Sequence, residues 1–126
     1  MKNLLAAAAL IFAATPATAR DPLVGDWGGS CRPDLQCWIE IRNAKGGGYR
    51  VRYVAANSMD ASKVVCDAKG SVKAVPGTST ILAGRFARGQ RIEILSGRGE
   101  IVVGATDNEP CGRPLAVNGV YQAIGD

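Results

Sequence analysis

The chain has 126 residues, with 15 Lys and Arg, 11 Asp and Glu, four Cys and no His, and its formal charge is +4. This length accommodates one small domain, and the lack of histidine excludes every mechanism or metal site that needs an imidazole. With 47% hydrophobic and 21% charged residues, the composition is that of a globular chain and not of a disordered one.

The chain begins with the pattern of a secretory signal peptide. Lys2 gives a short positive start, residues 4–14 are an almost unbroken apolar run, and the small residues 17–19 follow. An apolar run of about 11 residues covers only about half of a 30 Å hydrocarbon core, which disfavours a permanent transmembrane helix. We therefore expect a signal peptide over residues 1–19, a single β domain over 20–126 with no integral membrane segment, and a bacterial periplasmic or secreted location.

Alternating apolar and polar side chains predict short strands in the exported chain. The first begins around residues 24–27, and the clearest pair covers 37–42 and 49–53, joined by a glycine-rich turn at 43–48. This hairpin has an apolar face and a basic face. Residues 55–62 are small and polar enough to be a loop.

The second half of the chain continues this pattern. Strands are expected at 63–66, extended by 71–75 past a possible bend at Gly70, and then at 80–86, 91–95, 100–103 and 117–124. Turns at 76–77, 87–89 and 96–99 and a loop over 105–110 separate them. Helical periodicity is absent, so we predict an all-β fold, a small antiparallel barrel or sandwich of seven to eight strands. Closure is favoured because it removes exposed edges.

The four cysteines are Cys31, Cys37, Cys66 and Cys111, an even number that allows three pairings in an oxidising compartment. We favour Cys31 with Cys37, across a Pro-Asp turn, and Cys66 with Cys111. A C-x-x-C pair is missing, which argues against metal ligation and against thioredoxin-type redox chemistry. We expect two structural disulfides.

Gly25-Asp26-Trp27 matches the G-x-W motif that opens many small antiparallel barrels. On this motif the chain resembles the calycin-type barrel inhibitors of bacterial metalloproteases, and in size, export and cysteine content it is similar to the periplasmic lysozyme inhibitors. The resemblance implies a barrel in which Trp27 plugs one end and which blocks a hydrolase. The chain differs in its four cysteines and in lacking a second tryptophan late in the sequence, and residues 46–49 match the lysozyme inhibitors' loop motif only loosely. The alternative is that Trp27 is simply a core residue.

Residues that could carry catalysis are scattered. Without histidine, Ser-His-Asp and Cys-His arrangements are excluded. Glu40, Glu93 and Glu100 could in principle form the two-carboxylate pair of a glycosidase, but each has an outward position on its strand, where a solvated role is expected. The glycines at 46–48 and 97–99 lack the strand-to-helix context of a phosphate loop. We expect no enzyme activity, no catalytic residues, no cofactor and no metal.

Basic side chains gather on the predicted strands. Arg42, Arg50 and Arg52 can lie together beside Trp38, and a second group comprises Arg85, Arg88 and Arg91. Such a surface attracts an acidic protein surface or an anionic envelope polymer, while nucleic acid is not expected at a charge of about +3 after signal removal. A solvated face is the alternative. The candidate partner-binding residues are Trp38, Gly47, Gly48, Tyr49, Arg50 and Arg52.

These observations favour a non-catalytic binding protein that inhibits an envelope or secreted hydrolase, either a peptidoglycan hydrolase such as lysozyme or a protease. A rigid, disulfide-braced barrel would insert a loop, 46–49 or 105–110, into the enzyme's cleft with little entropic cost. The alternatives are a small-ligand carrier, which needs an open barrel interior, and an envelope structural or assembly factor. The target and the oligomeric state stay open.

Overall fold

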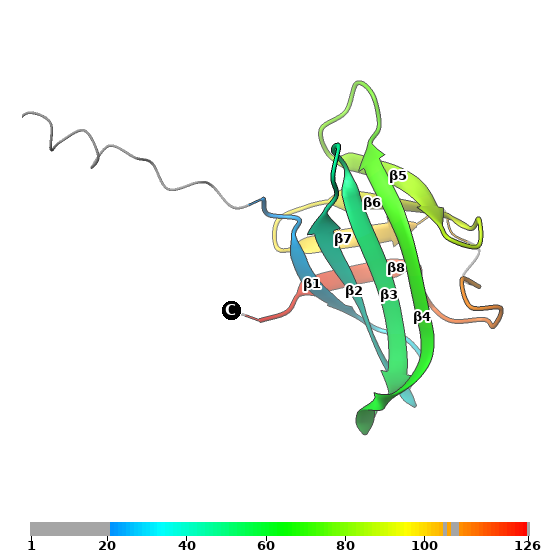
Figure 1. The fold of residues 1–126 in the computed structure, drawn as a ribbon. Coiled ribbons are helices and arrows are strands. Elements are labelled where there is room, and N and C mark those ends of the chain that lie inside the picture. Colours follow the sequence, from blue (N-terminus) through cyan, green and yellow to red (C-terminus); the bar gives the residue numbers. More distant parts are fainter. Residues whose placement is uncertain (1–20, 105, 107–108, 126) are drawn as a thin grey trace, which may run out of the picture.

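The computed structural model describes residues 21–104, 106 and 109–125, and it is a closed barrel of eight antiparallel strands (Figure 1). Each strand pairs with the next in sequence, and β8 returns to pair with β1. The all-β prediction is therefore confirmed, in its barrel form. The strands are β1 (Gly25–Gly29), β2 (Leu35–Asn43), β3 (Tyr49–Asn57), β4 (Asp60–Ala74), β5 (Ile81–Phe86), β6 (Arg91–Ser96), β7 (Glu100–Gly104) and β8 (Gly119–Ala123).

Alternation along the strands separates an apolar interior from a polar exterior. In the β2–β3 pair, Ile39 lies opposite Tyr53 and Ile41 opposite Val51, and all four side chains are at most 3% exposed. Their neighbours on the other face include Glu40 and the arginines. The period of two dictates this arrangement, because successive side chains of a strand point to opposite faces.

Side chains fill the barrel interior. Among the described residues, 19 buried ones form the core, and large ones such as Trp27, Phe86 and Tyr121 come from different strands. Trp27 is 5% exposed, and its indole Nε1 donates to the carbonyl of Leu23, 3.1 Å away in the segment before β1. In the middle of β8, the Tyr121 hydroxyl donates to the Val117 carbonyl at 2.6 Å.

Two disulfides brace the barrel, in the pairing that the sequence favoured. Cys31 bonds to Cys37 and closes the loop between β1 and β2. Cys66 of β4 bonds to Cys111 and fixes the segment that leads from β7 to β8. Every cysteine of the described chain is paired. The long β7–β8 connection, which also buries Leu115 and Val117, is thereby held against the body of the barrel.

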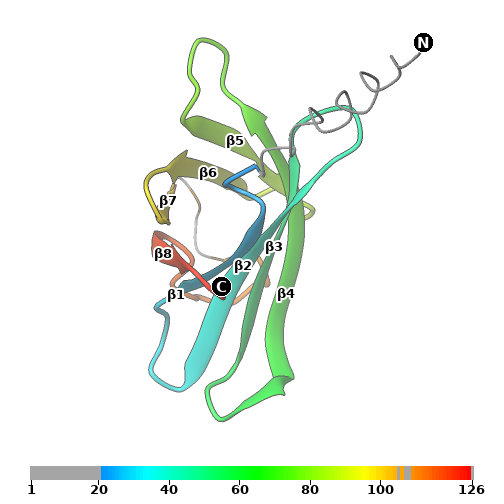
Figure 2. The ribbon, with the colours of Figure 1, turned by 90° about the vertical axis from the view of Figure 1, so that its left-hand side faces the viewer.

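The longest strands, β2, β3 and β4, extend beyond the rest of the barrel at one end (Figures 1 and 2). The prediction of a loop over 55–62 is wrong, because β3 continues to Asn57 and β4 begins at Asp60. Register shifts between Ala55 and Asn57 accommodate the additional residues that β4 has in this part of the β3–β4 pair. Small residues there looked like a loop from the sequence, but they pack tightly, since Ala55 and Ala56 are fully buried.

Other boundaries differ from the predictions by small amounts. β4 runs without interruption through Gly70, where a bend was possible, and β8 is shorter than the predicted 117–124. The predicted signal peptide, and part of the predicted loop 105–110, fall outside the described residues. Within the described residues, the structure has no helix long and apolar enough to cross a membrane.

Candidate functional site

A basic surface covers the outer face of β2, β3 and β4 and continues onto β5. We call it the basic wall and define it by the cations that line two neighbouring hollows: Arg42, Lys45, Arg50, Arg52, Lys69, Lys73 and Arg85. Among the described residues that line these hollows, Glu40 is the only acid. The strand register brings these cations together, because Arg42 lies opposite Arg50 and Arg52 lies opposite Lys69.

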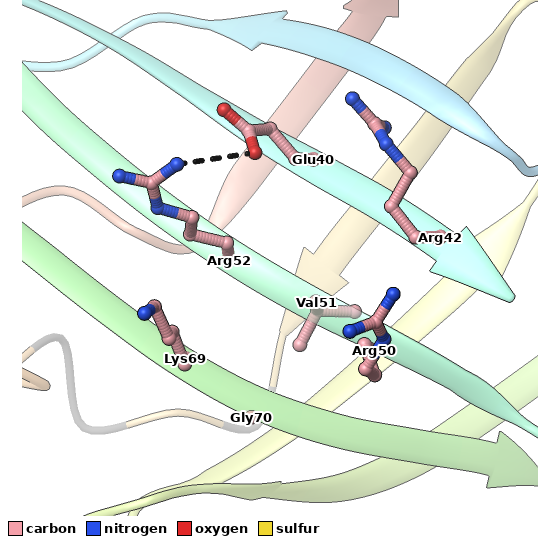
Figure 3. Close-up of a pocket in the computed structure, with 7 residues that line it drawn as sticks. All are labelled: Glu40, Arg42, Arg50, Val51, Arg52, Lys69 and Gly70. Atoms are coloured by element: carbon pink, nitrogen blue, oxygen red, sulfur yellow. Dashed lines mark hydrogen bonds and ion pairs between the residues drawn. The ribbon is translucent and has the colours of Figure 1, made fainter. Parts of the chain in front are cut away.

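The first hollow, of about 250 Å³, lies between Arg42, Arg50, Arg52 and Lys69 (Figure 3). Gly70 also lines this hollow and contributes no side chain. A Cβ atom at Gly70 would lie 2.5 Å from the Arg85 carbonyl oxygen and 2.9 Å from the Phe86 Cα atom. The close approach of β4 and β5 therefore requires a glycine here.

Carboxylates hold two of the arginines in place. Arg42 Nη2 donates to Asp26 Oδ1 at 2.8 Å, and its Nη1 donates to the Gly25 carbonyl at 3.0 Å. Arg52 donates twice to Asp67, at 2.8 and 2.7 Å, and makes a longer contact of 3.5 Å with Glu40 Oε1. The positive charges of Arg42 and Arg52 are therefore compensated by carboxylates. Both side chains are partly exposed, with 45% of the Arg42 and 40% of the Arg52 side chain accessible.

Other cations of the basic wall make no close contact with a carboxylate of the described residues. Within the described part of the chain, Arg50, Lys69, Lys45 and Lys73 make no ion pair. Arg50, Lys69 and Lys45 are all exposed. The wall thus keeps a net positive charge around Arg50, and such a surface attracts anionic groups.

The second hollow, of about 780 Å³, lies beside the glycine turn between β2 and β3. Gly46, Gly47 and Gly48 have φ angles of +81°, +101° and +73°, a conformation that glycine adopts readily. The Ala44 amide donates to the Gly48 carbonyl at 3.2 Å and closes the turn. Gly47 and Gly48 line the hollow together with Lys73 and Arg85 from β4 and β5.

Two candidate residues lie away from the centre of the basic wall. Tyr49 packs against the core, and its hydroxyl donates to Asp21 Oδ2, a bond that raises the pKa of Tyr49 to about 12, with burial and the negative charge of Asp21 adding to the effect. Trp38 is half-buried and lines neither hollow, and its Nε1 donates to Glu40 Oε2 at 3.0 Å. Trp38 thereby contacts the acid that lines the first hollow.

The sequence indicated Arg42, Arg50 and Arg52 as one group, and the structure brings them together. The sequence analysis did not include Lys69 and Lys73 in this group, although both lie on outward positions of β4. The signal is present, since Asp67, Lys69, Ser71 and Lys73 alternate with apolar or small residues, but the predicted strand at 63–66, extended by 71–75, does not include residues 67–70. Arg85 also joins the wall, whereas Arg88 belongs to the hollow beside Cys111.

Glu40, Glu93 and Glu100 do not converge. Glu40 contacts Arg52, Glu93 lies 3.9 Å from Arg91, and Glu100 accepts from Gln122 on β8 at 3.2 Å. Among the residues with described positions, no three acids or cysteines gather in a way that could hold a metal ion. In comparisons with known proteins, no family model, no curated protein and no solved structure matches this chain.

Proposed function

We propose that the protein is a non-catalytic binding protein of the periplasm or the extracellular medium that inhibits a hydrolase, with a peptidoglycan-cleaving enzyme such as lysozyme or an exported protease as the target. The observation that carries this proposal is the group of exposed cations that make no ion pair with the described residues, Arg50, Lys69 and Lys45, beside a projecting glycine turn. Such a surface complements an acidic rim around an enzyme's cleft. Arg50, Arg52, Gly47 and Gly48 contact the enzyme, while Tyr49 and Trp38 hold the hairpin in shape.

Rigidity supports inhibition by docking. The hairpin is part of a closed barrel with two disulfides, and the Arg42–Asp26 and Arg52–Asp67 pairs link it to β1 and to β4. A surface that is already ordered loses little conformational entropy on binding. Only the long side chains of the exposed cations named above must be immobilised when the complex forms.

The buried interior supports binding through the outer surface and not the carrier alternative. The side chains of Ile39, Tyr53, Ile94 and Ile101 are fully buried at the centre of the core. A carrier of this size would need that space for its ligand. The outward side chains of the basic wall are the ones that a partner can reach.

Disulfides support the location. Two of them in a chain of this size are typical of proteins in oxidising compartments outside the cytoplasm, where an inhibitor would meet envelope or secreted hydrolases.

Enzyme inhibition tests the proposal. The oxidised protein, at micromolar concentration, is incubated with lysozymes, peptidoglycan hydrolases and exported proteases, and residual activity is measured. We expect one class to be inhibited, and the double variant Lys45→Glu/Lys69→Glu to weaken inhibition at least about tenfold, as loss of two charge contacts at an interface would. Lys63→Glu/Arg113→Glu, with the same charge change at exposed positions outside both hollows, should inhibit normally. If no hydrolase is bound or slowed, the proposal fails.

One further observation favours the second candidate, an envelope structural or assembly factor. Ile81, Leu95, Val102 and Val120 are direct cross-strand partners across β5 to β8, and they form an aliphatic row in which the last three side chains are 43%, 39% and 48% exposed. This candidate predicts stable co-purification with a membrane complex, abolished by Val102→Lys, and no effect on any hydrolase.

A further inference from the structure

A straight row of arginines runs across the strands, from Arg42 in the basic wall to Arg91 on β6, just beyond it. Direct cross-strand partners link Arg42 to Arg50, Arg50 to Ser71, Ser71 to Arg85 and Arg85 to Arg91. Neighbouring strands are about 4.8 Å apart, so this arginine row covers about 19 Å of the barrel wall from β2 to β6. Four positive charges and one hydroxyl group thus lie on one line, perpendicular to the strands.

The arginine row costs stability that the fold does not need. Arg42 lies directly opposite Arg50, and Arg85 lies directly opposite Arg91. Like charges at directly opposite positions of neighbouring strands repel and destabilise the pair. Neutral side chains at these exposed positions would close the barrel equally well, because the core lies on the other face. In each pair one arginine has a carboxylate nearby, Asp26 for Arg42 and Glu93 for Arg91, so an anionic ligand would supply the counter-charge for the other one.

The ends of the row have carboxylate partners, whereas the centre has none among the residues with described positions. Arg42 contacts Asp26 at 2.8 Å, and Arg91 lies 3.9 Å from Glu93. Arg85 Nη1 donates to the Gly89 carbonyl at 2.8 Å, which orients the guanidinium without compensating its charge. Arg50 has no ion-pair partner within the described residues. Arg50 and Arg85 are therefore two free anchors, about 10 Å apart on either side of Ser71.

We propose that the arginine row binds a linear polyanion that carries phosphate groups along its chain. The planar guanidinium group matches a phosphate through two parallel hydrogen bonds, and this geometry favours arginine over lysine at such contacts. A chain with repeated charges can contact the free anchors at the same time, whereas a single small anion reaches one. The hollows of about 250 and 780 Å³ on either side of the row leave room for the chain between the side chains.

Two other ligand classes fit the row less well. The row has no aromatic side chain on which a base could stack, and base stacking supplies much of the affinity for single-stranded nucleic acid. An acidic protein surface matches the wider basic wall, whereas the row itself is a line of charges on the convex side of the barrel. The inference does not depend on the proposed inhibition, because it concerns a different ligand and is measured by binding alone.

Equilibrium binding to defined polymers tests the inference. The full oxidised protein is titrated with orthophosphate, tripolyphosphate, long-chain polyphosphate, polyglutamate and oligo-dT, at low and at moderate salt. We expect long-chain polyphosphate to bind at least about tenfold more tightly than tripolyphosphate, and orthophosphate to bind most weakly. In Arg50→Gln/Arg85→Gln, affinity for the long chain should fall at least about tenfold, and the slope of log K against log salt should decrease by about 1.4, for two lost contacts at about 0.7 each.

A matched variant separates the row from net charge. Lys63→Gln/Arg113→Gln removes the same two charges from exposed positions that line neither hollow, and it should bind within about twofold of the unchanged protein. Circular dichroism and thermal unfolding confirm that all variants are folded. The inference is overturned by equal losses in the two double variants, by no dependence on polymer length, or by tighter binding of polyglutamate or oligo-dT than of polyphosphate at equal charge.

Discussion

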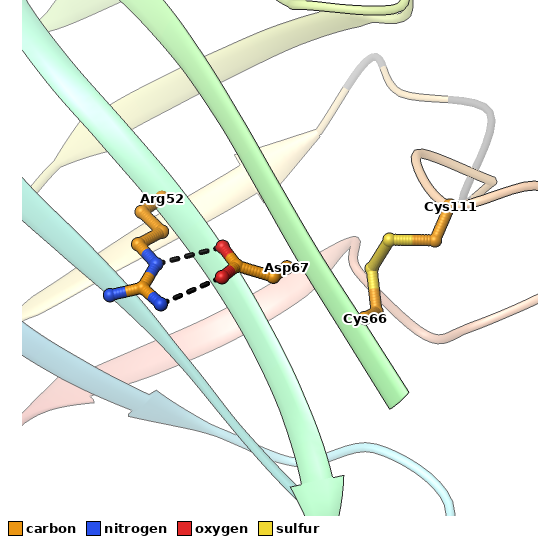
Figure 4. Close-up of a disulfide and its surroundings, with 4 residues drawn as sticks. All are labelled: Arg52, Cys66, Asp67 and Cys111. Atoms are coloured by element: carbon orange, nitrogen blue, oxygen red, sulfur yellow. Dashed lines mark hydrogen bonds and ion pairs between the residues drawn. A yellow bond between two sulfur atoms is a disulfide. The ribbon is translucent and has the colours of Figure 1, made fainter. Parts of the chain in front are cut away.

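Arg52 holds Asp67 across the β3–β4 pair through two parallel hydrogen bonds, Nε to Oδ1 at 2.8 Å and Nη2 to Oδ2 at 2.7 Å (Figure 4). The two residues are diagonal neighbours on the outer face, since Arg52 lies opposite Lys69 and Asp67 lies opposite Val54. Asp67 directly follows Cys66, which is bonded to Cys111. The ion pair and the disulfide thus fix adjacent residues of β4 on opposite faces of the wall.

Acid should weaken the fold through Asp67. The hydrogen bonds from Arg52 lower the pKa of Asp67 below its ordinary 3.8, helped by the positive charge of Arg52 and opposed by partial burial. A carboxylate whose pKa is lower in the folded than in the unfolded state stabilises the fold above the ordinary pKa, and this stability is lost as the pH falls below about 4. Because both side chains are more than one-third exposed, the pair contributes at most about 1 kcal/mol.

The measurement is urea unfolding between pH 2 and 6 for the unchanged protein, Asp67→Asn and Arg52→Gln. Both variants should lose part of the acid sensitivity below about pH 4 and differ little from each other there. An Arg52→Gln variant with the full acid sensitivity of the unchanged protein would show that Arg52 is not the cause.

Alkali should weaken the fold through the tyrosines. The bond to Asp21 raises the pKa of Tyr49 to about 12, burial raises that of Tyr53 to about 12, and burial raises that of Tyr121 as well. Since the phenols ionise near pH 10 in the unfolded chain, the stability they contribute is complete below pH 10 and is lost as the pH rises towards 12. At pH 11, the phenolate absorbance should report about one-tenth ionisation of Tyr49 and Tyr53 in the folded protein and about nine-tenths after unfolding. Ionisation of Tyr49 and Tyr53 near pH 10 in the folded protein would contradict this prediction. Comparison with Tyr49→Phe shows which part of the absorbance change belongs to Tyr49.

The two disulfides should differ in their effect on stability. Cys66 and Cys111 are 45 residues apart and Cys31 and Cys37 are six apart. In the loop-entropy account, removing the long bridge costs about 4 kcal/mol and removing the short one about 2.4 kcal/mol. Guanidinium unfolding of Cys66→Ala/Cys111→Ala and of Cys31→Ala/Cys37→Ala, each compared with the oxidised protein, checks the order. An equal or larger loss for the short bridge would mean that native-state packing outweighs chain entropy.

Most strands could be predicted from the sequence because one face of the strand is buried and the other is exposed. Cys37, Ile39 and Ile41 face inward and Glu40 and Arg42 face outward, so the period of two is visible in the residue types alone. The same signal fails at Ala55 and Ala56, where both faces of β3 are covered and small side chains pack on each side. Burial on both faces removes the alternation, and without it the end of β3 resembled a loop.

The candidate site could be predicted only in part because register is a property of strand pairs. The arginines of one hairpin are near in sequence, so Arg42, Arg50 and Arg52 were found together. The pairing of Arg50 with Ser71 and of Ser71 with Arg85 joins two groups that are 35 residues apart in sequence. The register that joins them is set by inward packing and by the close contact at Gly84, neither of which is visible in a local pattern.

Gly84 should tolerate no side chain. A Cβ atom there would collide with the Ser71 carbonyl oxygen and would lie 2.8 Å from the Val72 Cα atom, and both obstacles belong to the backbone. Gly84→Ala must push β4 and β5 apart, at a cost of about 2–4 kcal/mol. Gly104→Ala is the matched control, because a Cβ atom at Gly104 meets nothing within 4 Å, and it should change stability by less than about 1 kcal/mol. Chemical unfolding gives the free energy of unfolding of both variants. If Gly84→Ala and Gly104→Ala lose similar amounts of stability, β4 and β5 do not approach each other closely at Gly84.

Neighbouring valines of β7 should respond differently to the same substitution. Val103 is 1% exposed and packs in the core, whereas Val102 is 39% exposed and belongs to the aliphatic row on the outer face. Val103→Ala removes two buried methyl groups and leaves a cavity, so we expect a loss of about 2–3 kcal/mol. Val102→Ala should cost less than about 0.5 kcal/mol if the row is open to solvent in the isolated protein. The free energy of unfolding of each variant is measured at several protein concentrations. A large, concentration-dependent loss for Val102→Ala would mean that a second copy covers the row, because only association links stability to protein concentration.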